Sequence, residues 1–160
     1  MSRSRSTVSG DLSAEIEAFI QSHSVARLAT ASINGIPAVI PICYAHRHRV
    51  LYSALDQKPK SVPVTELKRV RNILSNPHVS IVIDDYCDDW SRLAQVTING
   101  LAELMYPPES SSSEEHMKAV AMLKEKYQQY RSMAIEANPV IKITIINARL
   151  WRSGDANESK

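Results

Sequence analysis

The segment VARLATASINGIPAVIPICY, residues 25–44, consists of two apolar runs on either side of the dipeptide Asn34-Gly35. An Asn-Gly dipeptide between two such runs is the strongest short-range signal of a β-hairpin. Pro41 in the second run cannot donate a backbone hydrogen bond, which places that run at a sheet edge or at a bulge. The segment therefore predicts two antiparallel strands, over residues 25–32 and 37–44.

Further β-rich runs continue this meander along the chain. One of them is long and contains Asn99-Gly100, which predicts a bend or bulge within the strand. The expected strands cover residues 49–54, 78–84, 92–106 and 140–147, with a polar turn at 45–48 before the first of them. About six strands in meander order predict a mainly β fold, a small antiparallel β-barrel with two or three peripheral helices.

The helices are expected outside the barrel. Asp11 is positioned to cap a first helix, and a second helix begins near Thr65 and ends before Pro77. A third covers residues 114–131. The chain divides into a flexible tail at 1–10, a single domain at 11–152 and a second flexible tail at 153–160.

Composition limits the class of protein. The 160 residues carry 19 Lys and Arg against 17 Asp and Glu, and a net charge of +2 does not favour binding to nucleic acid or to a membrane surface. No apolar run approaches the roughly 18 residues that span a bilayer, and no apolar stretch follows the basic start as in a secretory signal. Cys43 and Cys87 form no CxxC pair and are expected to be reduced. We expect a single cytoplasmic domain.

The motifs of several enzyme classes are absent from the sequence. It contains no GxGxxG, P-loop, HExxH, GxSxG or paired-cysteine zinc signature. His46 and His48 supply two imidazoles, but two ligands do not make a metal site, and a polar turn accounts for both. The acidic residues around Asp88 lack the spacing and the central glycine of a calcium loop. No metal is therefore expected.

Cations gather in one short stretch, where Glu66 is the only acid. Such a cluster offers phosphate both the opposite charge and hydrogen-bond donors, and the Pro-containing loop gathers it at one mouth of the barrel. A solvated helix face is the alternative. The absence of interleaved aromatic residues favours a small phosphorylated ligand over nucleic acid. The cluster comprises Lys58, Lys60, Lys68, Arg69 and Arg71.

Two other residues stand out on expected strands. Gln95 lies in the apolar run LAQVTI, where a buried amide needs partners in the backbone or at the polar edge of a ligand ring. Trp151 combines a flat apolar surface with the neighbouring cation Arg152, although on the sequence alone core packing is the favoured explanation of this tryptophan.

Several of these segments, in this order and spacing, resemble the pyridoxamine 5'-phosphate oxidase-like split-barrel superfamily over residues 12–152. A narrower pair of motifs is similar to its deazaflavin (coenzyme F420)-dependent oxidoreductases: Ser53-Ala-Leu-Asp-x-Lys58-Pro-Lys60 and Tyr86-x-Asp88-Asp89-Trp90. The segments that carry the superfamily resemblance are Val25-Ala-Arg-Leu-Ala-Thr, Gly35-x-Pro37, Pro41, Leu51-Tyr-Ser, Lys68-Arg69-x-Arg71-Asn72-Ile73-x-x-Asn76-Pro77-x-Val79-Ser80 and Gln95-Val96-x-x-x-Gly100-x-Ala102.

The resemblance implies a split-barrel homodimer with a flavin-type cofactor at the subunit interface. It places backbone groups of Val39, Ile40 and Pro41 along the cofactor ring, Tyr52 and Ser53 near the ring or ribityl chain, Lys68 and Arg69 on the phosphate, and Gln95 on the ring, with a looser correspondence for Lys58, Lys60 and Trp151. Ile42 stands where the true oxidase has a lysine, which argues against vitamin B6 oxidation.

The expected activity is hydride transfer between this cofactor and a small electrophilic substrate. Flavin mononucleotide (FMN) carries one terminal phosphate, whereas F420 carries a phosphodiester and a carboxylate-rich tail that a longer cationic groove would suit. Lys58, Lys60 and Arg71 supply the extra charges and favour F420. No catalytic acid is assigned, and Tyr44, Tyr86 and ordered water stay open as proton donors. An FMN-dependent flavoprotein and a non-enzymatic flavin- or haem-binding protein are the alternatives.

Overall fold

The computed structural model describes residues 10–56, 62–108 and 114–154. These residues form three α-helices: α1 (Ala14–Ser22), α2 (Lys68–Ser75) and α3 (Glu114–Lys126). They form seven strands: β1 (Ala26–Ala31), β2 (Pro37–Ile42), β3 (Ala45–Arg47), β4 (Val50–Ala54), β5 (His78–Asp85), β6 (Ala94–Met105) and β7 (Val140–Arg152). Short 3-10 helices fill several connections, at Val64–Glu66, Trp90–Arg92, Gln128–Ser132 and Ile135–Ala137.

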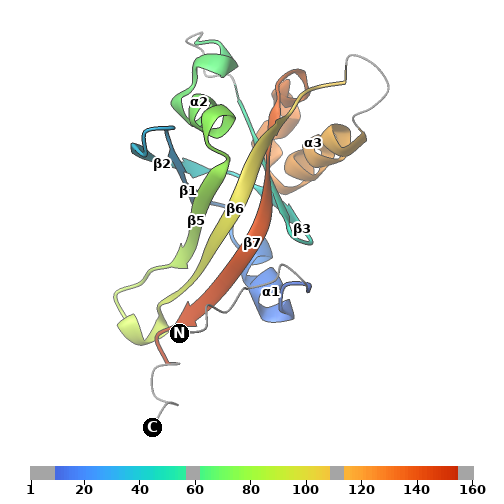
Figure 1. Cartoon of the computed structure of the whole chain (residues 1–160). Coiled ribbons are helices and arrows are strands. Elements are labelled where there is room, and N and C mark those ends of the chain that lie inside the picture. The colour runs from blue at the N-terminus through green and yellow to red at the C-terminus, as the bar shows by residue number, and fades with distance from the viewer. Residues whose placement is uncertain (1–9, 57–61, 109–113, 155–160) are drawn as a thin grey trace.

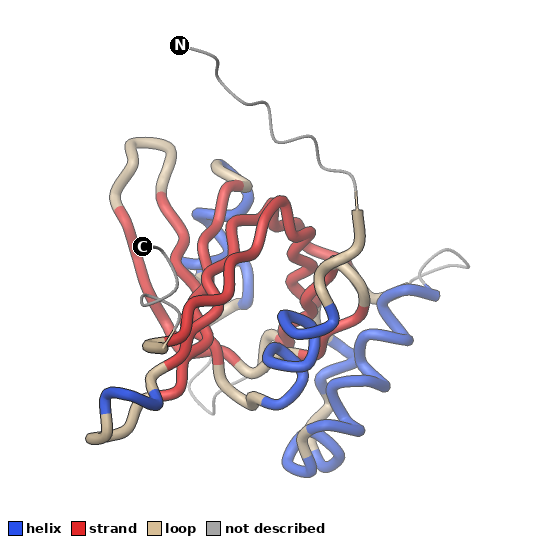
Figure 2. The backbone as a smooth tube through the Cα atoms, turned by 90° about the horizontal axis from the view of Figure 1, so that it is seen from below, coloured by secondary structure: helices blue, strands red, loops and turns tan. Residues whose placement is uncertain are grey.

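The seven strands make one antiparallel sheet in the order β2-β1-β5-β6-β7-β4-β3. The sheet is not closed, since β2 and β3 are its two edges. Figure 1 shows α2 and α3 on opposite sides of the long β6–β7 pair, with α1 near its lower end. Seen from below, the strands curl around a common centre (Figure 2). The fold is therefore the predicted split antiparallel barrel.

The first hairpin follows the sequence closely. Gly35 has φ +79°, a value that favours glycine, and its N–H donates to the Ser32 carbonyl at 2.9 Å. β1 and β2 then pair from Ala31↔Pro37 to Ala26↔Ile42. β2 is an edge strand, so the predicted edge position of Pro41 is confirmed.

The predicted irregularity in the long strand is also present. The β6–β7 register shifts between Asn99 and Gly100. A Cβ at Gly100 would meet the Thr144 carbonyl oxygen at 2.7 Å and Ile143 Cγ2 at 2.8 Å, so only glycine allows this close approach of the two backbones.

Four expectations about element bounds were wrong. Ser13, not Asp11, caps α1, since its Oγ accepts from the Ile16 N–H. Residues 45–47 form a strand where a turn was expected, because a two-residue turn brings them back onto β4, and this makes seven strands, not six. α3 ends at Lys126, where the chain tightens into a 3-10 helix. The last strand continues to Arg152 because it pairs with β6 to its end.

Apolar side chains form two clusters, one on each surface of the sheet. The inward cluster, here called the barrel core, includes Leu28, Ile81, Val96, Ile143 and Val70 of α2. The second lies between α3 and the outward side of β3, β4 and the start of β7, and includes Ala45, Tyr52, Leu123, Tyr127 and Val140. We call this second region the covered face.

The remaining outward surface of the sheet has no helix over it among the described residues. It comprises outward side chains of β2, β1, β5, the first half of β6 and the second half of β7, and we call it the open face. Successive cross-strand partners trace this face across the sheet. They are Val39, Ala29, Ser80, Asn99 and Asn147. Antiparallel partners share a face, so these side chains all lie on one surface.

None of the described helices is long and apolar enough to cross a membrane.

Candidate functional site

Four residues singled out from the sequence lie on the open face. Gln95 is the direct cross-strand partner of Trp151, and Val39 and Pro41 face the same way on β2, three strands from Gln95. Val39 is 62% exposed and Trp151 is 43% exposed. Ile40, between Val39 and Pro41, instead packs against the barrel core. The open face thus combines exposed apolar surface with an amide.

The side-chain amide of Gln95 lacks hydrogen-bond partners among the described residues, although neighbouring polar side chains pair across the strands. Ser80 donates to Asn99 at 2.8 Å, and Asn99 donates to Asn147 at 3.2 Å. A half-buried amide with free donor and acceptor groups can bind the polar edge of a planar ligand.

The predicted phosphate-binding cations lie at the start of α2. Val70 and Ile73 anchor this helix in the barrel core, and the Asn72 side chain donates to Thr30 Oγ1 at 2.9 Å. Lys68 is exposed, whereas Arg69 is half-buried. Lys58 and Lys60 lie outside the described residues.

Arg69 has an unusual setting for an arginine. Burial lowers the pKa of its guanidinium, while the Asp56 carboxylate and Tyr130 act in the opposite direction. Among the described residues no carboxylate lies within 4.0 Å of it, so its charge is only partly compensated. A half-buried, incompletely paired guanidinium suits an anionic group of a ligand.

Sequence reasoning missed the residues that surround Arg69. Tyr130 is buried in the 3-10 helix after α3, and burial, together with nearby Cys43 and Asp56, raises the pKa of its phenol. No motif marks these residues, because they meet only through the chain's return from α3 to the barrel. The segment after β4, the start of α2 and the segment after α3 therefore lie near enough for their charges to interact around Arg69.

Tyr52 and Ser53 lie next to each other on β4 but face opposite ways. The Tyr52 hydroxyl donates to Glu115 Oε1 at 2.8 Å, and the Ser53 hydroxyl donates to the Cys43 carbonyl at 2.9 Å. Burial and the Glu115 carboxylate raise the pKa of Tyr52. Both side-chain hydroxyls are therefore committed to partners within the chain.

The tyrosines considered as proton donors differ sharply in accessibility. Tyr44 is fully buried and donates to the Ile20 carbonyl, and burial raises the pKa of its phenol. Tyr86 is 70% exposed in the β5–β6 connection. Only Tyr86 of the pair can reach a ligand without local unfolding.

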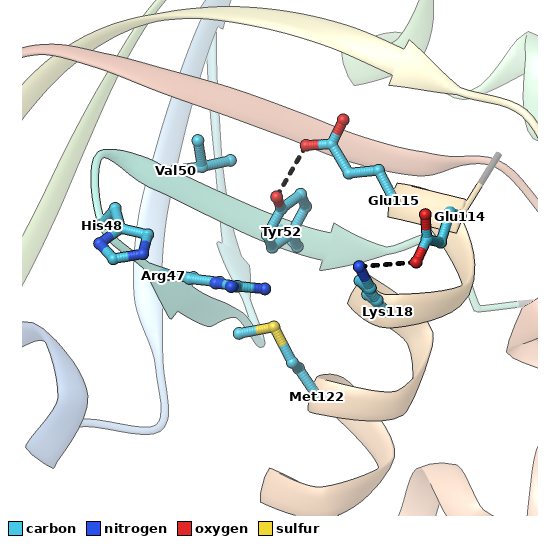
Figure 3. Close-up of a pocket in the computed structure, with 8 residues that line it drawn as sticks. All are labelled: Arg47, His48, Val50, Tyr52, Glu114, Glu115, Lys118 and Met122. Carbon is cyan, nitrogen blue, oxygen red and sulfur yellow. Dashed lines mark hydrogen bonds and ion pairs between the residues drawn. The ribbon is translucent and has the colours of Figure 1, made fainter.

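A pocket of about 340 Å³ opens between the β3–β4 hairpin and α3 (Figure 3). Arg47, Tyr52, Glu115, Lys118 and Met122 are among its lining residues. This pocket is on the covered face and so lies apart from Gln95 and Trp151. Within the described residues, no group of three or more His, Cys, Asp or Glu side chains is arranged to hold a metal ion.

Solved structures share this architecture. A conserved hypothetical protein from Mycobacterium tuberculosis has a TM-score of 0.70 and 18% identity, covering 96% of this chain and 91% of its own. The haem storage protein HutZ from Vibrio cholerae has a TM-score of 0.65 and 17% identity, with coverage of 89% and 95%. An F420 reductase has a TM-score of 0.58 and 19% identity, with coverage of 83% and 94%. At identities this low, the structural likeness shows a common fold and nothing more.

No curated protein matches the chain. A family model described as pyridoxamine 5'-phosphate oxidase matches residues 12–152, nearly the whole of the described chain. The match spans the barrel strands, α2 and the open face together. The chain belongs to the pyridoxamine 5'-phosphate oxidase family.

Proposed function

We propose that this protein is an oxidoreductase that transfers hydride between a flavin-type cofactor, with F420 favoured over FMN, and a small electrophilic substrate. The observation that carries the proposal is the open face, where Val39, Pro41, Gln95 and Trp151 share one exposed surface of the sheet. The similar fold of an F420 reductase supports the same choice of cofactor.

The residues present fit a phosphorylated ring cofactor. Arg69 offers a half-buried cation with no carboxylate within 4.0 Å among the described residues, and Lys68 lies exposed beside it. Gln95 offers an unused amide, and Trp151 offers a flat apolar surface next to it. Phosphate, ring edge and ring face would each find a matching group.

The chain's own contribution is binding and orientation. Arg69 and Lys68 would hold the phosphate, Gln95 would fix the ring edge, and Trp151 would limit access of water. When bound, the cofactor supplies the atom that carries the hydride. Tyr86 is the accessible phenol for proton delivery.

The other predicted contacts would be made by the backbone and by further cations. Tyr52 and Ser53, whose hydroxyls are already bonded within the chain, stay proposed as neighbours of the ring or ribityl chain. Val39, Ile40 and Pro41 lie on β2, which has a strand partner on one side only in the described sheet. Lys58 and Lys60 remain the proposed contacts to the longer anionic tail of F420.

The same surface supports the proposal of a homodimer. The open face exposes Val39 and Trp151, and Ile36 beside it is 58% exposed. Exposed apolar side chains grouped on one sheet surface are typical of an interaction site. We therefore propose that a second copy covers this face and encloses the cofactor.

The test is a pair of fluorescence titrations of the purified protein, one with oxidised F420 and one with FMN. Arg69→Gln should weaken either cofactor roughly ten- to hundredfold, the effect of losing a hydrogen bond to a charged group. Arg47→Gln, at an arginine on the covered face, is the matched control and should leave both affinities unchanged. Lys58→Ala with Lys60→Ala should weaken F420 far more than FMN.

Each outcome changes the assignment in a defined way. Preference for FMN would make the protein an FMN-dependent flavoprotein. Equal losses of F420 and FMN in the double lysine variant would remove the argument for the longer groove. If neither cofactor binds, the oxidoreductase proposal is wrong.

A haem-binding function is the second candidate, favoured by the likeness to a haem storage protein. Three histidine rings already have partners: His23 with Asp85 and Phe19, His46 with His48, and His116 with Asn138. His48 and His78 are exposed, with no side-chain hydrogen bond among the described residues. A Soret band on haem addition that His48→Ala or His78→Ala abolishes would support this function.

A further inference from the structure

The pocket between the β3–β4 hairpin and α3 has a charge pattern that the proposed cofactor site does not use. Its volume is about 340 Å³, within the range of small-molecule sites. It lies on the covered face, whereas Gln95 and Trp151 lie on the open face. Its polar and apolar side chains come from three neighbouring elements, β3, β4 and α3.

Both acids of the pocket are already paired. Glu114 Oε1 lies 2.8 Å from Lys118 Nζ. Glu115 Oε1 lies 2.9 Å from Lys142 Nζ and also accepts from the Tyr52 hydroxyl at 2.8 Å. These ion pairs lower the pKa of both carboxyl groups, so both stay ionised at neutral pH. Neither acid is free to neutralise a further cation.

Arg47 is that further cation. Figure 3 shows its side chain reaching from the hairpin into the space between Tyr52 and Met122. Among the described residues its guanidinium forms no hydrogen bond and no ion pair. A planar guanidinium binds a carboxylate through two parallel hydrogen bonds.

The surroundings of Arg47 select among anions. One unpaired cation balances one negative charge, so a dianion such as a phosphate monoester would keep a negative charge without a partner in this pocket. Val50 and Met122 provide apolar lining beside the guanidinium. An alkyl chain can pack there, and Met adapts readily to its shape.

We propose that this pocket binds a short aliphatic monocarboxylate, with Arg47 holding the carboxylate and Val50 and Met122 contacting the alkyl chain. The ligand site is separate from the proposed cofactor site, so either can be present without the other.

The test is a titration of the full-length protein with butanoate. Saturation-transfer NMR and calorimetry each measure the binding. We expect saturable binding below about 10 mM. Arg47→Gln should weaken it roughly tenfold or more, and Arg47→Lys, which keeps the charge but loses the planar fork, should weaken it by a smaller factor. Met122→Gln should weaken butanoate more than acetate.

Matched controls distinguish binding in this pocket from binding elsewhere on the protein. Arg69→Gln should leave butanoate binding unchanged, and butanamide, which has the same chain without the charge, should not bind measurably. Thermal unfolding of each variant checks that it folds. The proposal is wrong if butanoate does not saturate, if Arg69→Gln and Arg47→Gln weaken it equally, or if inorganic phosphate competes better than acetate.

Discussion

The open face and the covered face are two parts of the same outward surface of one sheet, yet their side chains differ in burial. On the covered face, Leu123 of α3 is fully buried, and Tyr52 and Tyr127 are almost so. On the open face, Val39 and Trp151 remain exposed. The boundary is the bulge at Asn99/Gly100, where the β6–β7 register shifts.

The difference shows that the part of the sheet under α3 contributes to stability, whereas the part without a helix over it is left available for binding. Tyrosines on the covered face carry hydrogen bonds as well as apolar contact: Tyr52 bonds to Glu115, and Tyr127 bonds to the backbone near Tyr44. The open face has cross-strand polar pairs and exposed apolar groups, but its Gln95 amide has no hydrogen bond among the described residues. A surface with exposed apolar groups and an unbonded amide is suited to binding a ligand or a second copy of the chain.

The largest effect is expected from breaking the covered face. Leu123→Ala removes a fully buried side chain and should lower the free energy of unfolding by about 2–5 kcal/mol. Val39→Ala, at a 62% exposed position on the open face, should change it by about 0.5 kcal/mol or less in the monomer. Urea unfolding at low protein concentration measures both.

Protein concentration makes this comparison sharper. If a second copy covers the open face, the cost of Val39→Ala should grow as the protein concentration rises, while the cost of Leu123→Ala should not. If the two variants lose the same free energy of unfolding at low protein concentration, the two faces do not differ in their contribution to stability.

The next effect is expected at the boundary. Gly100→Ala places a Cβ against the Thr144 carbonyl oxygen, 2.7 Å away, and a backbone atom cannot move aside as a side-chain end can. We expect a loss of about 1–3 kcal/mol, typical of overpacking. Gly154→Ala has open space around its Cβ and is the control. A Gly100→Ala protein as stable as the control would mean that the bulge does not depend on glycine.

The sequence predicted the open face much better than the covered one. Asn34-Gly35, Pro41 and Asn99-Gly100 are local signals, and each sets the position of a strand on the open side. Alternating strands then bring Gln95 and Trp151 together without further information. The family resemblance named both residues, and the register makes them direct partners.

The covered face has no comparable local signal. Tyr52, Glu115 and Lys142 meet there from β4, α3 and β7, which are far apart in the chain. The same holds for Tyr130, Asp56 and Arg69. Periodicity predicts which side of α3 is apolar, but not which polar atoms are paired beneath it. The polar residues at 45–48 predicted a turn, whereas residues 45–47 pair with β4 beside this network.

A smaller effect is expected from one hydroxyl at the junction of the two clusters. The Tyr127 hydroxyl accepts from the Tyr44 N–H at 2.9 Å and lies 2.8 Å from the carbonyl oxygens of Ser24 and Tyr44. Tyr127→Phe leaves that buried N–H without a partner and should cost about 1–2 kcal/mol. Tyr86→Phe, at an exposed phenol, should cost almost nothing. Equal stability of the two variants would show that packing alone holds Tyr127.

The smallest effect concerns the charge of Lys126 at the end of α3. Its ammonium lies 3.9 Å above the Tyr44 ring, and burial lowers its pKa to about 8. Below pH 8 both folded and unfolded chains carry this proton, and the folded chain bears the full desolvation penalty. Between pH 8 and the higher pKa of the unfolded chain, near 10.5, only the unfolded chain keeps the proton, so stability rises with pH.

Lys126→Met removes this dependence. At pH 7 the variant should be about 1 kcal/mol more stable than the parent chain, a value reduced because the side chain is only half-buried and because the Tyr44 ring favours the cation. The difference should shrink steadily between pH 8 and pH 10 in urea unfolding curves. Lys118→Met, at an exposed lysine of the same helix, is the control that should show no such trend. A parent chain more stable than Lys126→Met at pH 7 would mean that the contact with Tyr44 outweighs the desolvation of the ammonium, and that the covered face gains stability from the half-buried cation over Tyr44.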